Sequence, residues 1–138
     1  MIFKSDTGVP KRLPKEDWCE VDILTCAAPN LRPMPNNAMN PGNDSALHLT
    51  DKEVLEIHIS RARHMLRIAA ANGDEVLVLG AFGCGAFQNK PEIVARAYKE
   101  VLPEFDGYFK LIEFAVYCSP RDENNYEAFK KAFGDISK

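Results

Sequence analysis

The chain has 138 residues, of which 46% are hydrophobic and 27% charged, and its formal net charge at pH 7 is -3. This length and composition predict a single globular domain over residues 1–138. The 17 basic side chains, set against 20 acidic ones, leave no dense basic face for nucleic acid. No apolar run reaches the roughly 20 residues of a membrane span, so we expect neither nucleic acid nor a membrane as a partner.

The first fifty residues hold one predicted strand and much irregular chain. Residues 1–20 are polar and rich in turn formers, with at most a short strand at residues 2–3. Residues 21–28, VDILTCAA, form a nearly continuous apolar run, which predicts a strand buried on both faces of a parallel sheet. Residues 29–50 contain four prolines and five asparagines. Connections of this length are usually functional or mobile.

A helix is predicted from residue 51 onward. Thr50 with Glu53 forms the pattern of a capping box, and Asn72-Gly73 predicts the end of the helix near Ala71. At helical spacing, one face collects mainly apolar side chains and one histidine, which predicts the core-facing side: Val54, Leu55, His58, Ile59, Ala62, Met65, Leu66 and Ala69.

The remaining elements alternate between strand and helix. Residues 75–80 and 110–118 predict two strands, Pro91 predicts the start of a helix between them, and residues 122–133 predict a closing helix. Such alternation is typical of an α/β fold with a parallel sheet and right-handed crossovers. Ligands of these folds bind at the carboxyl ends of the strands, where the Pro/Asn stretch, a glycine loop and residues 118–125 would meet.

The glycine loop lies in VLVLGAFGCGAFQNKP, residues 76–91. It is not a P-loop, because Ala86 and Phe87 follow Gly85 where Lys and Ser or Thr are required. A dinucleotide fingerprint fails at Gln88, and the residues around Cys84 do not form a nucleophile elbow. Two interpretations stay open. Successive amides ahead of a helix can bind an anion such as a diphosphate, or the glycines serve a tight turn for packing alone.

The four cysteines are scattered without a CxxC pair. This spacing favours a reduced, cytoplasmic protein with no metal site, and the N-terminus lacks the apolar core of a signal peptide. Cys84 precedes a predicted helix N-terminus, where a thiolate would be stabilised. We therefore keep a catalytic cysteine as a minor alternative to a small residue packed beneath the loop.

Three segments resemble one family in the same order along the chain. VLVLGAFGCGAFQNKPEIVARAYKEVL, DILTCAAPN and VYCSPRDENNYEAFKKAF are similar to stretches of the microbial-type poly(ADP-ribose) glycohydrolases, a branch of the macrodomain superfamily. The resemblance implies a macrodomain-like three-layer α/β fold with a mostly parallel sheet. It also implies ADP-ribose or an ADP-ribosylated protein as the partner, and no cofactor.

The resemblance also assigns roles to residues. Gly83, Cys84, Gly85 and Ala86 would cradle the diphosphate, Phe87 would lie near the distal ribose, and Tyr126 would lie against adenine. Gln88 and Lys90 stand where the family more usually has Gly and Asp. The full set of expected ligand-binding residues is Gly80, Ala81, Phe82, Gly83, Cys84, Gly85, Ala86, Phe87, Asn89 and Tyr126.

The catalytic signature of the family, a glycine triplet followed by Gln-Glu-Glu, does not occur in these 138 residues. We therefore expect an N-terminally truncated, partial domain that binds without turnover, and we assign no catalytic residue. Two alternatives remain: a glycohydrolase completed by an upstream segment or partner chain, and a structural remnant without a ligand. Three parallel strands would leave an uncovered sheet surface, which predicts self-association unless residues 1–20 cover it.

Overall fold

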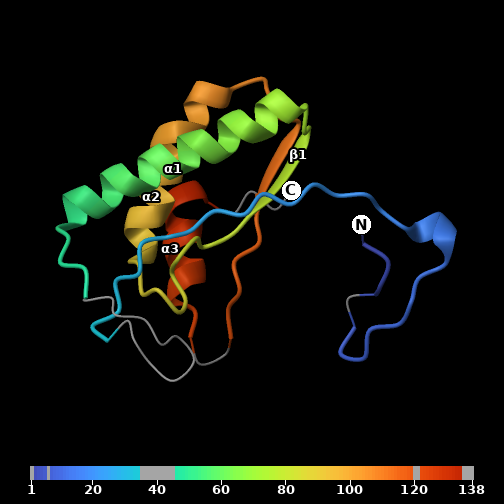
Figure 1. Ribbon diagram of the computed structural model, residues 1–138, viewed down its shortest axis with the longest axis horizontal. Helices are drawn as coiled ribbons and strands as arrows, with labels where there is room; N and C mark the ends of the chain where they lie inside the picture. The colour runs from blue at the N-terminus through green and yellow to red at the C-terminus, as the bar shows by residue number, and fades with distance from the viewer. Residues whose placement is uncertain (1, 6, 35–45, 120–121, 135–138) are drawn as a thin grey trace.

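The computed structural model describes residues 2–5, 7–34, 46–119 and 122–134 (Figure 1). Three α-helices and two strands form the body of the molecule, with two short 3-10 helices. In chain order they are η1 Lys15–Asp17, α1 Asp51–Asn72, β1 Val76–Leu79, α2 Pro91–Val101, η2 Leu102–Phe105, β2 Leu111–Phe114 and α3 Asn124–Phe133.

Local sequence signals set the ends of α1 as predicted. The Thr50 amide donates to Glu53 Oε2 at 2.7 Å, and the Glu53 amide donates to Thr50 Oγ1 at 3.3 Å, which completes the capping box. Gly73 ends the helix in the left-handed conformation with φ 81°. The buried residues of α1 all belong to the predicted apolar face: Val54, His58, Ala62, Leu66 and Ala69.

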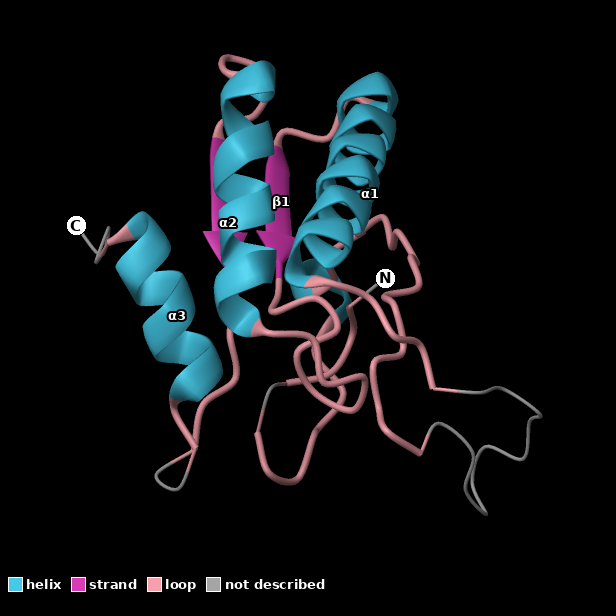
Figure 2. Ribbon diagram, turned by 90° about the vertical axis from the view of Figure 1, so that its left-hand side faces the viewer, coloured by secondary structure: helices cyan, strands magenta, loops and turns pink. Residues whose placement is uncertain are grey.

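The two strands pair in parallel, with Val76 opposite Leu111 and Leu79 opposite Phe114. Helix α2 is the crossover between them and carries the core. Val94 and Val101 are fully buried there, and they pack in one cluster with residues of α1 and α3. Figure 2 shows α2 in front of the strands with α1 and α3 on either side, so the described helices lie on one face of the sheet. The predicted parallel α/β arrangement is thus present.

The other face of the sheet is bare. Val76, Val78 and Leu111 are 55%, 69% and 52% exposed. The N-terminal segment does not cover this face, because in Figure 1 residues 2–19 extend away from the helices and strands. This segment is held to itself by isolated bridges, Ile2 with Cys19 and Lys4 with Arg12. The expectation that residues 1–20 cover this face of the sheet is therefore wrong.

Two strand predictions also need correction. Residues 21–28 form a loop without strand pairing, and Ile23 is 83% exposed. An apolar run becomes a strand only beside a free hydrogen-bonding edge, and the described ladder joins β1 to β2 alone. The strand predicted over residues 110–118 ends at Phe114, because its neighbour β1 ends at Leu79 and turns into the glycine loop. The predicted strand at residues 2–3 is only the bridge from Ile2 to Cys19.

Candidate functional site

The carboxyl ends of β1 and β2 point to the same edge of the molecule (Figure 2). Because each helix runs antiparallel to the strands, the N-termini of α1, α2 and α3 face this edge as well. Helix N-termini carry partial positive charge from their free amides. The edge therefore combines loops with an electrostatic preference for anions, at the place predicted from the alternation of elements.

The glycine loop, residues 80–90, connects β1 to α2 at this edge. Gly83 has φ 79°, in the left-handed region. A Cβ at Gly83 would lie 2.5 Å from Ala28 Cβ and 2.7 Å from Asn89 Nδ2. Gly83 is thus required by both its backbone conformation and its surroundings. Gly85, by contrast, has nothing within 4 Å of an added Cβ.

Several amides of the loop are used in its own turns. The amides of Phe82, Cys84, Gln88 and Asn89 donate to loop carbonyl oxygens at 2.8–3.1 Å. Within the described part of the chain, no hydrogen bond is recorded for the amides of five other loop residues: Ala81, Gly83, Gly85, Ala86 and Phe87. Gly85 and Ala86 are exposed, whereas Ala81, Gly83 and Phe87 are half-buried.

Asn89 holds the loop together from inside. The residue is only 2% exposed. Its Nδ2 donates to the carbonyl oxygens of Pro29 at 2.8 Å and Gly83 at 2.9 Å. The side chain is thus buried and its hydrogen-bonding groups are used inside the protein, and the predicted contact of Asn89 with a ligand stays a prediction. Asn89 positions the loop.

His58 of α1 supports Asn89. Its Nε2 lies 2.8 Å from Asn89 Oδ1, and its ring meets Phe82 edge-on with ring centroids 5.6 Å apart. Since Asn89 Nδ2 faces carbonyl oxygens, Oδ1 is the acceptor and His58 Nε2 carries the proton. Burial lowers the pKa of His58, and the nearby Arg61 charge adds to this, against the hydrogen bond to Asn89. His58 is therefore the neutral brace of the loop, consistent with the apolar face on which the sequence put it.

The start of the Pro/Asn stretch forms one wall of the loop. The Leu31 amide donates to Phe87 O at 3.0 Å, and the Arg32 guanidinium lies 5.8 Å from the centre of the Phe87 ring. Sequence reasoning missed Arg32, although a basic residue soon after the first apolar run was the available signal. The proposed distal-ribose residue Phe87 thus has a cation beside it. Residues 35–45 lie outside the described part of the chain.

Cys84 is poorly suited to act as a nucleophile. Burial, with a smaller contribution from the Glu92 carboxylate, raises the pKa of its thiol to about 12. The thiol is therefore protonated at neutral pH. The partial positive charge at the N-terminus of α2 does not offset the effect of burial on the thiolate. This favours the interpretation of Cys84 as a small residue packed beneath the loop.

Tyr126 lies on the first turn of α3, which also faces the edge, and it is half-buried. Its described ring contact is with Lys130 of the same helix, whose Nζ lies 5.7 Å from the ring centroid. The adenine-stacking role of Tyr126 remains a prediction.

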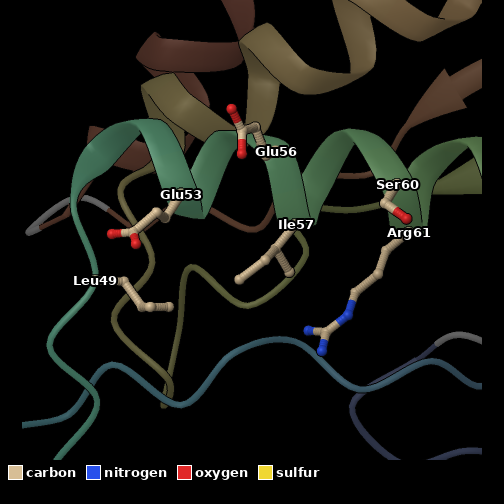
Figure 3. A pocket seen from close by; sticks show the side chains of 6 residues that line it. All are labelled: Leu49, Glu53, Glu56, Ile57, Ser60 and Arg61. Atoms are coloured by element: carbon tan, nitrogen blue, oxygen red, sulfur yellow. The ribbon is translucent and has the colours of Figure 1, made fainter.

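Three further properties bear on the kind of site. Across residues 2–5, 7–34, 46–119 and 122–134, no group of three or more His, Cys, Asp or Glu residues could hold a metal ion, and no helix could cross a membrane. A cavity of about 480 Å³ lies along α1, lined by Leu49, Ile57 and Arg61 among others, and not at the glycine loop (Figure 3). We still favour the loop as the main site, since exposed amides bind anions without an enclosed cavity.

The chain is similar to solved bacterial poly(ADP-ribose) glycohydrolases. With the Deinococcus radiodurans enzyme in complex with ADP-ribose it shares 31% identity and a TM-score of 0.67, covering 95% of this chain and 48% of that chain. Another crystal form of the same complex matches at 40% identity and a TM-score of 0.54, over 59% of this chain and 33% of that chain. The Thermomonospora curvata enzyme bound to the inhibitor ADP-HPD matches at 35% identity and a TM-score of 0.58, over 62% and 33%.

A scan against protein-family models finds no match, and neither does a comparison with curated proteins. The resemblance to the glycohydrolase family and its fold, predicted from three segments, is nevertheless confirmed over nearly the whole chain. The chain spans about half the length of the Deinococcus radiodurans enzyme that it matches over 95% of its own residues.

Proposed function

We propose that this chain, which has the fold of the bacterial poly(ADP-ribose) glycohydrolases over about half their length, binds ADP-ribose or the ADP-ribosyl group of a modified protein. The diphosphate would lie on the amides of Gly83, Gly85 and Ala86, with Phe87 near the distal ribose and Tyr126 against adenine, while the Cys84 amide is used within the loop. The exposed amides carry this proposal. Backbone donors ahead of a helix N-terminus suit a diphosphate because they supply hydrogen bonds and a favourable dipole.

Binding without turnover is the form of the proposal that the sequence favours. Cleavage of a glycosidic bond needs a positioned acid or a group that stabilises the cationic transition state. The family's GGG and QEE motifs are absent from these 138 residues. Cys84 is no substitute, since a thiol whose pKa is raised to about 12 is a poor proton donor and carries no negative charge to stabilise a cation.

A second candidate function is glycohydrolysis with a segment or partner chain that supplies the missing acid. It is favoured by the names of the relatives, which are glycohydrolases, and by their greater length. Release of free ADP-ribose from a modified protein separates the two candidates. Turnover by these 138 residues alone would contradict binding without turnover.

Calorimetry with ADP-ribose tests the proposal itself. We expect saturable heat for the unmodified chain and for Arg96→Gln, an exposed control on α2 whose partner is Glu100. Gly83→Ala should abolish the heat. No heat and no change in melting temperature at millimolar ADP-ribose would favour the remaining alternative, a structural remnant without a ligand.

We also propose that the protein is cytoplasmic and self-associates through the bare sheet face formed by Val76, Val78 and Leu111. Free cysteines among the described residues suit a reducing compartment. Exposed apolar sheet surface favours association.

A further inference from the structure

Arg61 lies outside the glycine loop, between two neighbouring cavities along α1. The cavity of about 480 Å³ is lined by Leu49, Glu53, Glu56, Ile57, Ser60 and Arg61. The next, of about 400 Å³, is lined by Ser60, Arg61, Arg63, His64 and Arg67. In Figure 3 the Arg61 guanidinium points away from the helix, toward the blue stretch of chain that runs below α1. Ser60 and Arg61 are common to both cavities.

One nitrogen of the Arg61 guanidinium lacks an acceptor. Its Nη1 atom is buried and has no hydrogen-bond partner in the part of the chain that the structure describes. Buried donors are almost always paired, because an unpaired one loses its hydrogen bonds to water without replacement. An acceptor from outside the described residues is therefore expected at this atom.

The carboxylates nearby are already engaged. Glu53 accepts from Thr50 at 2.7 Å, and Glu56 lies 3.9 Å from Lys52. On the other side, Arg63 is neutralised by Glu104, with nitrogen–oxygen distances of 2.6–3.1 Å. Among the described residues, Arg61 thus forms no ion pair or hydrogen bond with these carboxylates, although Glu53 and Glu56 line the first cavity with it.

The helix dipole does not account for the basic residues. Cations stabilise a helix when they lie in its last turn. The last turn of α1 has no basic residue, whereas Arg61, His64 and Arg67 lie further back along the helix. Arg61 lines both cavities, and His64 and Arg67 line the second.

We propose that Arg61, with Ser60 and Arg67, forms a second anion site that takes a phosphate group. A guanidinium donates two parallel hydrogen bonds to phosphate oxygens, and the Ser60 hydroxyl adds a third donor. Leu49 and Ile57 provide an apolar wall for a ring attached to that phosphate. The source that fits is a second ADP-ribosyl unit of a polymer bound at the glycine loop. This source, unlike the phosphate chemistry, rests on the proposed function.

Titration of the ¹⁵N-labelled full chain with inorganic phosphate tests the chemistry. The side-chain Nε–H signals of Arg61 and Arg67 should shift and saturate, while that of Arg96 should not. Arg61→Gln identifies the Arg61 signal. No shift, or equal shifts of all arginines as expected from general screening, would overturn the site. If these shifts occur in a protein that binds no ADP-ribose, the proposed function fails and the phosphate site stands.

Binding of an ADP-ribose oligomer tests the source. Arg61→Gln should weaken binding of the oligomer by about tenfold, as expected for loss of a charge-assisted contact, and leave binding of monomeric ADP-ribose unchanged. Arg96→Gln should change neither. An equal loss for monomer and oligomer, an unchanged oligomer affinity, or equally tight binding of a single-stranded RNA with the same number of phosphates would overturn the assignment to the polymer.

Discussion

The Nε2 atom of His58 lies 2.8 Å from Oδ1 of Asn89, and each residue is only 2% exposed. This contact joins the middle of α1 to the end of the glycine loop, 31 residues further along the chain. Through Asn89 Nδ2 it also reaches Pro29 and Gly83. One buried amide therefore connects the helix, the loop and its wall, which gives the first prediction.

Asn89→Ala should lower the free energy of unfolding by about 2–4 kcal/mol, because it leaves the Pro29 carbonyl oxygen and the His58 N–H without partners and removes the side-chain contact to Gly83 O. Chemical denaturation measures the loss. Asn124→Ala, an exposed asparagine at the start of α3, is the control and should cost far less. Equal stability of the two variants would contradict the role of Asn89 as the centre of the loop.

Stability should decrease as the pH falls below about 6.5, the usual pKa of an unfolded histidine. Because the pKa of His58 is lowered in the folded protein, the unfolded chain binds the proton more readily there. The contribution of neutral His58 to stability is complete above the pKa of the unfolded chain and is lost progressively as the pH falls toward the lower pKa of the folded protein. Thermal unfolding at pH values from about 8 to about 5, on either side of the usual histidine pKa, measures this loss of stability. His58→Gln should have a shallower slope than the unmodified chain, and an unchanged slope would refute this.

Gly83→Ala should cost about 2–4 kcal/mol of stability, from the left-handed backbone and from overlap with Ala28 and Asn89. Gly85→Ala is the matched control for stability, because an added Cβ there meets nothing within 4 Å. We expect it to unfold within about 0.5 kcal/mol of the unmodified chain. Urea titration compares the two, and a stable Gly83→Ala variant would show that the loop adapts.

Gln88→Gly should leave stability unchanged or raise it by up to about 1 kcal/mol. Gln88 has φ 56°, a conformation that costs a non-glycine residue about 1–2 kcal/mol, partly offset by the greater freedom of glycine in the unfolded chain. Gln88→Val should be less stable than either, since a branched side chain fits this conformation poorly. Melting temperatures rank the three proteins, and a valine variant as stable as the glycine variant would contradict the argument.

Val78→Lys should reduce self-association, because it places a charge in the middle of the bare sheet face, where Val78 is 69% exposed. Light scattering at micromolar concentrations measures the mass. Lys99→Glu, on the exposed side of α2, should leave the mass unchanged. A monomeric unmodified chain would contradict self-association itself.

The sequence was sufficient for the features that depend on neighbouring residues. The capping box of Thr50 and Glu53, the stop at Gly73 and the start at Pro91 act within one helical turn, so the helices could be predicted closely. The alternation of strands and helices located the edge at which the glycine loop lies, because parallel strands carry their ends to one side. The resemblance to the glycohydrolases depended on the same local segments.

Only the tertiary structure decided what depends on distant partners. Residues 21–28 have the composition of a strand, but a strand requires another edge for its hydrogen bonds, and none of the described strands pairs with them. The sequence predicts Asn89 as a ligand contact, and only the fold reveals its burial and its hydrogen bonds to His58, Pro29, Gly83 and Phe87. Which loop amides are unpaired, and which guanidinium nitrogen is buried without an acceptor, depend on chain segments brought together by folding, and local sequence does not encode those distances.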